Sequence, residues 1–158
     1  MLAQSVIEGE GQYAKFGIYD IDTKKRKKAY ELFKKYIEFR PNDADAHQNL
    51  AELEDSTEKK KIGYLKAFYL GNVFLFDWLL TIAYRRDRDE AQKIADVAYD
   101  KIINEKISKI NSNQLNRLAL FFNGFLEILN PYSDINKNKA KILWILASEQ
   151  NNIMAKLN

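Results

Sequence analysis

The feature that most constrains the fold is the stretch from Ala29 to Ala51, which reads AYELFKKYIEFRPNDADAHQNLA. A residue that precedes proline is pushed out of the α region, so the sequence predicts that a helix ends near Arg40, before Pro41. Asp43 is a suitable N-cap for a second helix. Helices joined by so short a turn pack against each other. The first of them has apolar residues at the spacing of one buried face: Ala29, Leu32, Phe33, Tyr36 and Ile37.

Further helix boundaries are predicted along the rest of the chain. Helices are expected over residues 5 or 10 to 19, 44–54, 73–86 and 111–130, and another is expected to end at Gly71, a residue type that commonly follows a last helical turn. The remaining starts are marked by residues suited to N-caps, several with Glu or Gln three positions later: Asp22 or Thr23, Asp55 with Glu58, Asp87 with Glu90, Asn111 with Gln114, and Ser133 or Asp134.

These signals together predict an all-α fold of roughly seven to eight helices. Only six Gly and two Pro occur in 158 residues, so helix breakers are scarce. The length is that of one domain and is sufficient to bury a core. The last helix is expected to bury one face, which carries Ala140, Leu143, Trp144 and Ala147.

The Ala29–Ala51 stretch also resembles the junction between two tetratricopeptide repeats, helix-turn-helix units of about 34 residues. The resemblance covers roughly residues 10 to 54 and decays after that. It implies an antiparallel helix-pair solenoid of three to four repeats, in a single domain with units near 10–43, 44–72, 73–110 and 112–158. The residues that carry it are Tyr13, Phe16 and Gly17, then Ala29, Phe33 and Pro41, then His47, Leu50 and Ala51.

The residue inventory argues against catalysis. The chain has no Cys and one His, and it contains no Gly-rich phosphate loop, no His-Glu-x-x-His and no nucleophile elbow. We therefore expect no enzyme activity, no cofactor and no metal, although a carboxylate site of an unrecognised kind stays open as an alternative. His47 is interpreted as a groove or core residue, because the resemblance places it at an aromatic site.

The N-terminal and apolar segments predict a cytoplasmic protein without membrane insertion. The first twelve residues, MLAQSVIEGEGQ, contain no Lys or Arg and do not resemble a signal peptide. The apolar stretch 67–84 is interrupted by Gly71, Asn72 and Asp77, so it is interpreted as two helices and not as a membrane span. The abundance of Lys, Asn and Ile suggests an AT-rich genome, and we expect a bacterial source.

The resemblance implies that the first helix of each repeat lines a concave groove. Its inward positions then form a mixed wall of amides, charged groups and one Trp, which suits a partner peptide or helix with an apolar anchor. Burial of Trp78 and Ile82 by neighbouring helices is the alternative at those two positions. The candidate partner-binding residues are Gln48, Glu52, Trp78, Arg85, Asn116 and Asn123, and the same spacing adds Asp55, Ile82 and Leu120.

The function predicted is a non-catalytic protein-protein interaction module, acting as an adaptor, a chaperone or an immunity-type inhibitor. The alternative is a nucleic-acid-associated protein that uses the basic runs Lys24–Lys28 and Lys59–Lys61. A net charge of +3 is mild, and no aromatic residue interleaves with these lysines as a stacking platform would require. The sequence therefore disfavours nucleic acid and favours another protein or peptide as the partner.

Overall fold

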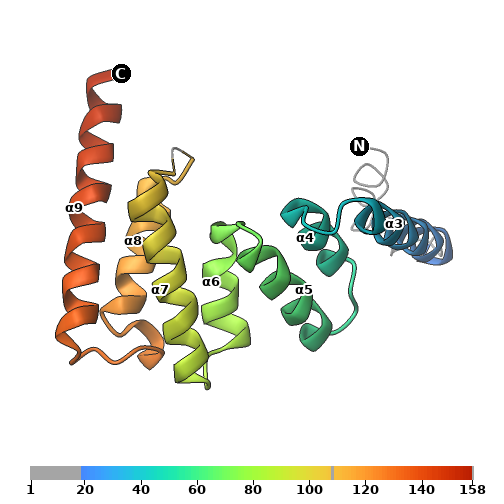
Figure 1. Ribbon diagram of the computed structural model, residues 1–158, viewed down its shortest axis with the longest axis horizontal. Helices are drawn as coiled ribbons and strands as arrows, with labels where there is room; N and C mark the ends of the chain where they lie inside the picture. Colours follow the sequence, from blue (N-terminus) through green and yellow to red (C-terminus); the bar gives the residue numbers. More distant parts are fainter. Residues whose placement is uncertain (1–18, 108, 158) are drawn as a thin grey trace. The chain divides into compact units, whose positions relative to one another are not determined.

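The computed structural model describes residues 19–107 and 109–157, and every element within those ranges is helical (Figure 1). The all-α prediction is confirmed, whereas the tetratricopeptide-like solenoid stays a prediction. The helix expected before Tyr19 and the match at Gly17 lie outside the described residues. The chain divides into two compact units, unit 1 at residues 1–72 and unit 2 at residues 73–158. A single domain with a repeat boundary near this place had been predicted, and the repeat units themselves stay a prediction.

Unit 1 contains three described helices, α3 (Tyr19–Phe39), α4 (Ala44–Glu52) and α5 (Thr57–Tyr69). The helix α3 ends immediately before Arg40 and Pro41, as predicted from the proline. Both α3 and α5 pack against α4. The buried side chains that hold α3 to the end of α4 are Ala29, Phe33 and Leu53, with Tyr30 and Leu50 packed against them.

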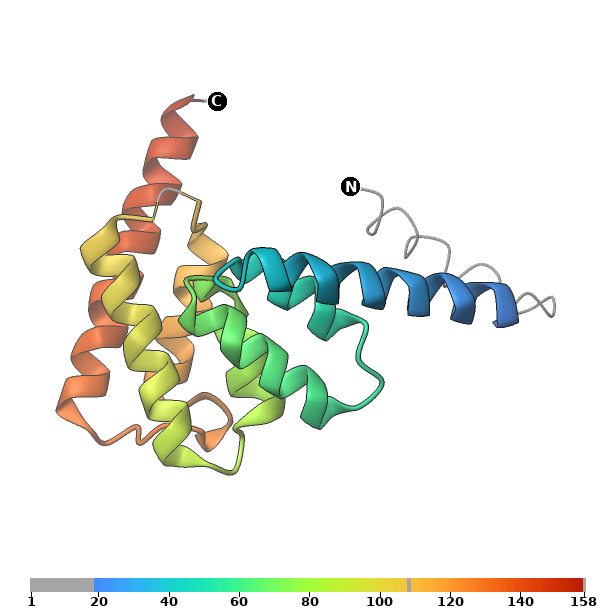
Figure 2. The same ribbon diagram turned by 45° about the vertical axis from the view of Figure 1, so that its right-hand side comes forward.

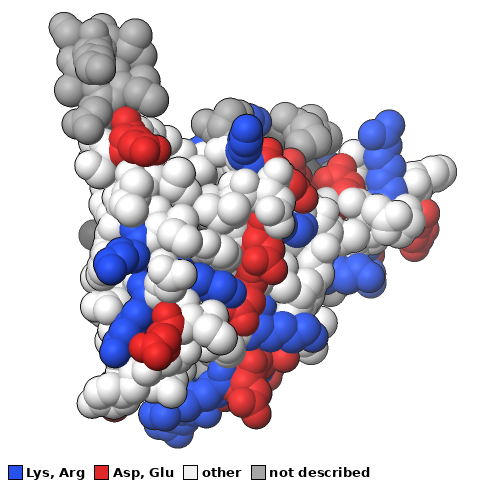
Figure 3. Space-filling view, turned by 60° about the vertical axis from the view of Figure 1, so that its left-hand side comes forward, with Lys and Arg blue, Asp and Glu red and all other residues white. Residues whose placement is uncertain are grey.

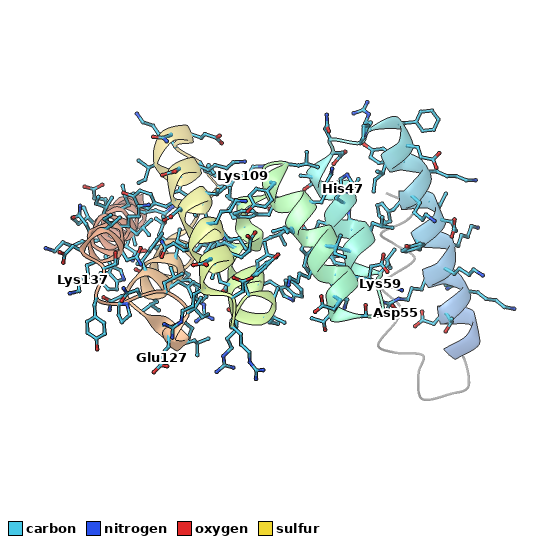
Figure 4. All side chains as sticks on the ribbon, turned by 60° about the horizontal axis from the view of Figure 1, so that its bottom comes forward. His47, Asp55, Lys59, Lys109, Glu127 and Lys137 are labelled. Carbon is cyan, nitrogen blue, oxygen red and sulfur yellow. The ribbon has the colours of Figure 1, made fainter. Side chains whose placement is uncertain are left out.

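Asp43 caps α4 as predicted, because its Oδ1 accepts a hydrogen bond from the Ala46 N–H at 3.1 Å. The predicted cap of α5 was wrong by one residue. Ser56 Oγ accepts from the Lys59 N–H at 3.2 Å, while the Asp55 carboxylate pairs with Lys59 Nζ at 3.4 Å (Figure 4). Since α5 begins at Thr57, only Ser56 stands in the capping position.

The predicted start of α3 at Asp22 or Thr23 was also wrong, because the described part of α3 already includes Tyr19. The end of α5 agrees with the prediction. Gly71 has φ 127°, its N–H donates to Phe68 at 3.0 Å, and the Asn72 N–H donates to Ala67 at 3.1 Å. Those two bonds form a Schellman C-cap.

Asp43→Ala is expected to destabilise unit 1 by about 1 kcal/mol at neutral pH. Hydrogen bonds, first from the Ala46 N–H and then from the Tyr36 hydroxyl, hold the pKa of Asp43 below its usual 3.8. The carboxylate therefore stabilises the folded state above pH 3.8, and this stabilisation is lost as the pH falls through the lower folded-state pKa. Urea unfolding at neutral and at strongly acidic pH measures both free energies.

The free energies of unfolding of the wild type and of Asp43→Ala should differ at neutral pH and become equal in acid. Asn42→Ala, at an exposed turn position, is the control and should behave as wild type at both pH values. A difference of equal size in acid would show that the carboxylate charge contributes nothing.

Unit 2 begins with one helical segment of changing geometry. It runs as a 3-10 turn η1 (Val73–Leu75), an α-turn α6 (Phe76–Trp78) and a π-helical turn η2 (Leu79–Ala83). The Tyr84 N–H donates to the Leu79 carbonyl, five residues back, at 2.9 Å. The helix predicted over residues 73–86 therefore ends at Ala83, since its last turn has widened to the π form.

Three longer helices complete unit 2 and lie side by side in Figures 1 and 2: α7 (Arg88–Glu105), α8 (Ser112–Phe122) and α9 (Asp134–Leu157). Asp87 and Asn111 are N-caps as predicted, and Asn111 with Gln114 forms a complete capping box. The Ser133 Oγ accepts from the Asn136 N–H at 3.3 Å at the start of α9. A 3-10 turn, η3 (Phe125–Glu127), separates α8 from α9.

The predicted extension of α8 to residue 130 was wrong. Gly124 follows the helix with φ 94°, a left-handed conformation that stops an α-helix and that glycine adopts readily. A Cβ at this position would lie 2.6 Å from Pro131 Cβ, so the returning chain also requires the absence of a side chain there. The sequence did contain this stop signal, because Gly124 directly follows the apolar stripe of α8.

Candidate functional site

The residues predicted to line the groove in unit 2 lie on two packed segments, which together we call the α6–α8 face. One set lies on or just after α6 and η2, and the other on or just after α8: Trp78, Ile82 and Arg85, then Asn116, Leu120 and Asn123. Ile82 is 56% exposed and Leu120 is 39% exposed, while Arg85 and Asn123 are also exposed. Trp78 and Asn116 are half-buried. The expected alternative was burial of Trp78 and Ile82 by neighbouring helices; Ile82 is exposed, whereas Trp78 is partly buried.

A salt bridge holds the two segments of this face together. Arg117 Nε donates to Asp77 Oδ1 at 2.9 Å, next to Trp78 in one segment and next to Asn116 in the other. The same Asp77 oxygen accepts from Thr81 Oγ1 at 3.3 Å. The Arg117 guanidinium also lies 4.6 Å from the centre of the Phe125 ring, at cation–π distance.

Sequence reasoning missed Arg117 because its partner is 40 residues away in the chain. Only the packing of α6 on α8 brings Asp77 and Arg117 together, and no local sequence pattern indicates that packing. The signal available was the placement of one charged residue on each predicted helix, beside an expected groove position.

Gln48 and Glu52 lie in unit 1, so the structure brings four of the six predicted residues onto one unit and these two onto the other. Gln48 Nε2 donates to Glu52 Oε1 at 3.1 Å, and Gln48 Oε1 accepts from Asn72 Nδ2. Burial, and then the Glu52 carboxylate, raise the pKa of Tyr64 to about 12, which keeps its hydroxyl neutral at physiological pH. These polar groups are therefore engaged within unit 1.

His47 and the basic runs also have partners in unit 1. The His47 ring nitrogen Nε2 lies 2.7 Å from the Pro41 carbonyl oxygen, across the turn between α3 and α4 (Figure 4). Arg26 donates from Nε to the Leu53 carbonyl at 3.3 Å and from Nη2 to the Glu52 carbonyl at 3.4 Å. A cation suits these last carbonyls of α4, so Arg26 acts as a C-cap.

A hollow of about 850 Å³ lies along the first turns of α9. It had not been predicted from the sequence. Trp144, which was expected on the buried face of α9, lies at the edge of the hollow and is more than a third exposed, because the helix presents Ala140, Leu143 and Ala147 to the core instead. The full lining is Tyr99, Asn123, Asp134, Ile135, Lys137, Asn138, Lys139, Lys141, Ile142 and Trp144.

A polar network joins α7 to α9 beneath this hollow. Asn136 is 2% exposed, and it exchanges two hydrogen bonds with the Gln92 amide, at 2.9 and 3.0 Å. The Gln92 amide also donates to Asp96 at 3.0 Å, and the Asp96 carboxylate accepts from Lys139 Nζ at 2.8 Å. Lys139 in turn lies 4.9 Å from the centre of the Tyr99 ring. The base of α9 is thus held to α7 by contacts that are satisfied within unit 2.

Within the described residues, no group of three or more acidic or His side chains is placed to hold a metal ion. Among the helices of the same residues, none combines the length and the apolar character that a membrane span requires. Comparison with protein-family models, with curated proteins and with solved structures finds no match. The resemblance to tetratricopeptide repeats accordingly stays a prediction.

Proposed function

We propose that this chain is a non-catalytic protein-binding module that holds a segment of a partner protein against the α6–α8 face. The observation that carries the proposal is the exposure of Ile82 and Leu120 on two packed segments. A single exposed apolar residue needs no explanation, whereas apolar residues gathered on one rigid face and rimmed by polar groups are typical of an interaction site.

The chemistry of the face selects the partner segment. Ile82 and Leu120 offer an apolar centre, and the half-buried Trp78 adds aromatic area of the kind that often dominates binding energy. Arg85 can pair with a carboxylate, and Asn116 and Asn123 can bond to an exposed peptide backbone. The proposed ligand is therefore a peptide or helix with one apolar anchor beside an acidic group.

The residues behind the face make it rigid. Leu79, Leu80, Leu118 and Ala119 lie on the same segments and are fully buried. Because the Asp77–Arg117 bridge also fixes one segment to the other, little ordering is needed when a ligand binds, which favours affinity. An adaptor, a chaperone and an immunity-type inhibitor in the cytoplasm could each use such a surface.

Ile82→Asp and Arg85→Glu are each expected to weaken binding to the partner by about tenfold or more, with an unchanged melting temperature. The first change removes apolar contact, and the second replaces pairing with like-charge repulsion. The partner is obtained by pull-down with the full chain and mass spectrometry, and its affinity for each variant is measured by titration calorimetry.

Two variants in unit 1 serve as controls for this test. Ile62→Asp places the same charge at another exposed isoleucine, and Lys25→Glu with Lys27→Glu reverses part of the basic run. Both should bind nearly as wild type. If the lysine reversals abolish binding while Ile82→Asp and Arg85→Glu do not, the α6–α8 face is not the site and the basic run is.

A further inference from the structure

The hollow along α9 has the form of an open trough. Seven of its ten lining residues are exposed, so it would leave much of a small molecule in contact with water. Small-molecule sites usually enclose most of the ligand surface. An open trough suits an extended element of another macromolecule.

The outer side of α9 carries an apolar stripe that the core does not use. Ile135 is 70% exposed and Ile145 is 55% exposed, with the half-buried Ile142 between them. Ile142 follows Ile135 by seven residues, and Ile145 follows Ile142 by three. This spacing places the three side chains along one side of the helix over about 15 Å. A partner helix of about three turns would match that length.

Two lysines border this stripe, and Asp134 lies with them along the trough. Lys137 and Lys141 are exposed and four residues apart, and neither forms an ion pair with any residue that the structure describes. Lys139 differs, because Asp96 holds it at 2.8 Å. Lys137 lies at the start of α9 in Figure 4, and Figure 3 shows basic and acidic groups intermixed on the side that carries α9.

Two lining residues of the trough are held in place by contacts with the core. The Tyr99 ring packs edge to face on the buried Phe122 ring with centres 5.9 Å apart, and Lys139 lies over both rings. The buried Gln92–Asn136 amide pair fixes the start of α9 against α7. The surface is therefore already shaped before any ligand binds, which lowers the ordering cost.

We propose that this trough, together with Ile145, which continues the apolar stripe beyond its lining, binds an acidic amphipathic helix of a partner protein, which lies along α9. The apolar side of that helix packs on Ile135, Ile142 and Ile145, and its carboxylates face Lys137 and Lys141. Charge complementarity of this kind selects the partner and speeds association. A second copy of the chain fits less well, because a two-fold pairing centred on Ile142 would bring Lys141 against its own symmetry mate.

The probe for this proposal is a fluorescent synthetic helix of three heptads, with leucine at positions a and d and glutamate at positions e and g. A second peptide has lysine in place of every glutamate. Fluorescence anisotropy with the full chain measures both affinities. The acidic peptide should bind at least about tenfold more tightly than the basic one, and added salt should weaken its binding.

Lys137→Glu with Lys141→Glu should abolish this preference or reverse it. The matched control is Lys24→Glu with Lys28→Glu, which changes two exposed lysines at the same spacing in α3 and should leave the affinity unchanged. Ile145→Gln should weaken binding of the acidic peptide while the helical content and melting temperature stay as in wild type.

Equal affinity for the two peptides, or equal loss in the α3 control, would overturn the proposal. So would a dimer in light scattering that Ile145→Gln dissociates, because the occupant would then be a second copy. The Ile82→Asp variant distinguishes binding at the trough from binding at the α6–α8 face. If Ile82→Asp abolishes binding of the acidic peptide and the α9 variants do not, the peptide occupies the α6–α8 face, and only the trough is rejected.

Discussion

Phe121→Ala is expected to destabilise unit 2 by about 3–5 kcal/mol, the usual range for removal of a buried aromatic side chain. Phe121 has no exposed surface. Its ring packs edge to face on Phe76 at 6.4 Å and on Phe125 at 5.6 Å, so the change leaves a cavity between α6, α8 and η3. The Arg117 guanidinium, 5.4 Å from the Phe121 ring centre, loses one of its two aromatic contacts as well.

Denaturant unfolding followed by circular dichroism measures this loss. The control is Leu120→Ala, the adjacent residue on the same helix, which is 39% exposed and should cost far less. If the two variants unfold at the same denaturant concentration, the orientation of α8 described above is incorrect.

Gly63→Leu is expected to destabilise unit 1 by about 3 kcal/mol, through overpacking where α4 and α5 cross. A Cβ on Gly63 would lie 2.6 Å from the Ala51 Cβ and 3.3 Å from the Ala51 Cα, closer than two helices can tolerate without moving apart. Ala51 is itself only 1% exposed, so it cannot move away from the new side chain without displacing other buried atoms.

Gly63→Ala provides a sharper form of the same experiment. Alanine favours an isolated helix by about 1 kcal/mol over glycine, so propensity alone predicts a more stable protein. We expect a less stable one, because the Cβ atoms overlap. Adding Ala51→Gly should recover part of the loss, and a double-mutant cycle measures that coupling. A stabilised Gly63→Ala protein would contradict the close approach.

Helix boundaries followed from the sequence where one residue decides them. Pro41 ended α3, Gly71 ended α5, and the side chains of Asp43, Asp87 and Asn111 capped three helices. Each of these signals depends on local backbone chemistry, so neighbouring elements do not alter it.

Features that depend on packing did not follow from the sequence. The contact of Gly63 with Ala51 arises between two helices, and no local pattern in the sequence indicates it. The π-helical turn η2 was not predicted either. Ser56 is the N-cap of α5, and Asp55 is not. Both residue types can cap a helix, so the cap is decided only by the residue at which the first turn begins.

The candidate site shows the same division. The repeat spacing predicted groove positions at Arg85 and Asn123; both side chains are exposed, and the groove itself stays a prediction. The α9 trough could not be predicted, because the contacts that hold it in place join residues that lie far apart in the chain, such as Lys139 with Asp96 and Asn136 with Gln92. Pairings at a distance of more than 40 residues leave no periodic signal in one sequence.

The reciprocal amide pair between Gln92 and Asn136 makes the position of α9 along α7 discrete. A shift of α9 by one turn, about 5.4 Å, would separate the two amides. Each buried polar group left unpaired costs about 1–3 kcal/mol. A force applied to the C-terminal helix α9 would therefore be resisted up to a threshold. Above that threshold α9 would detach by local unfolding and would not slide gradually along α7.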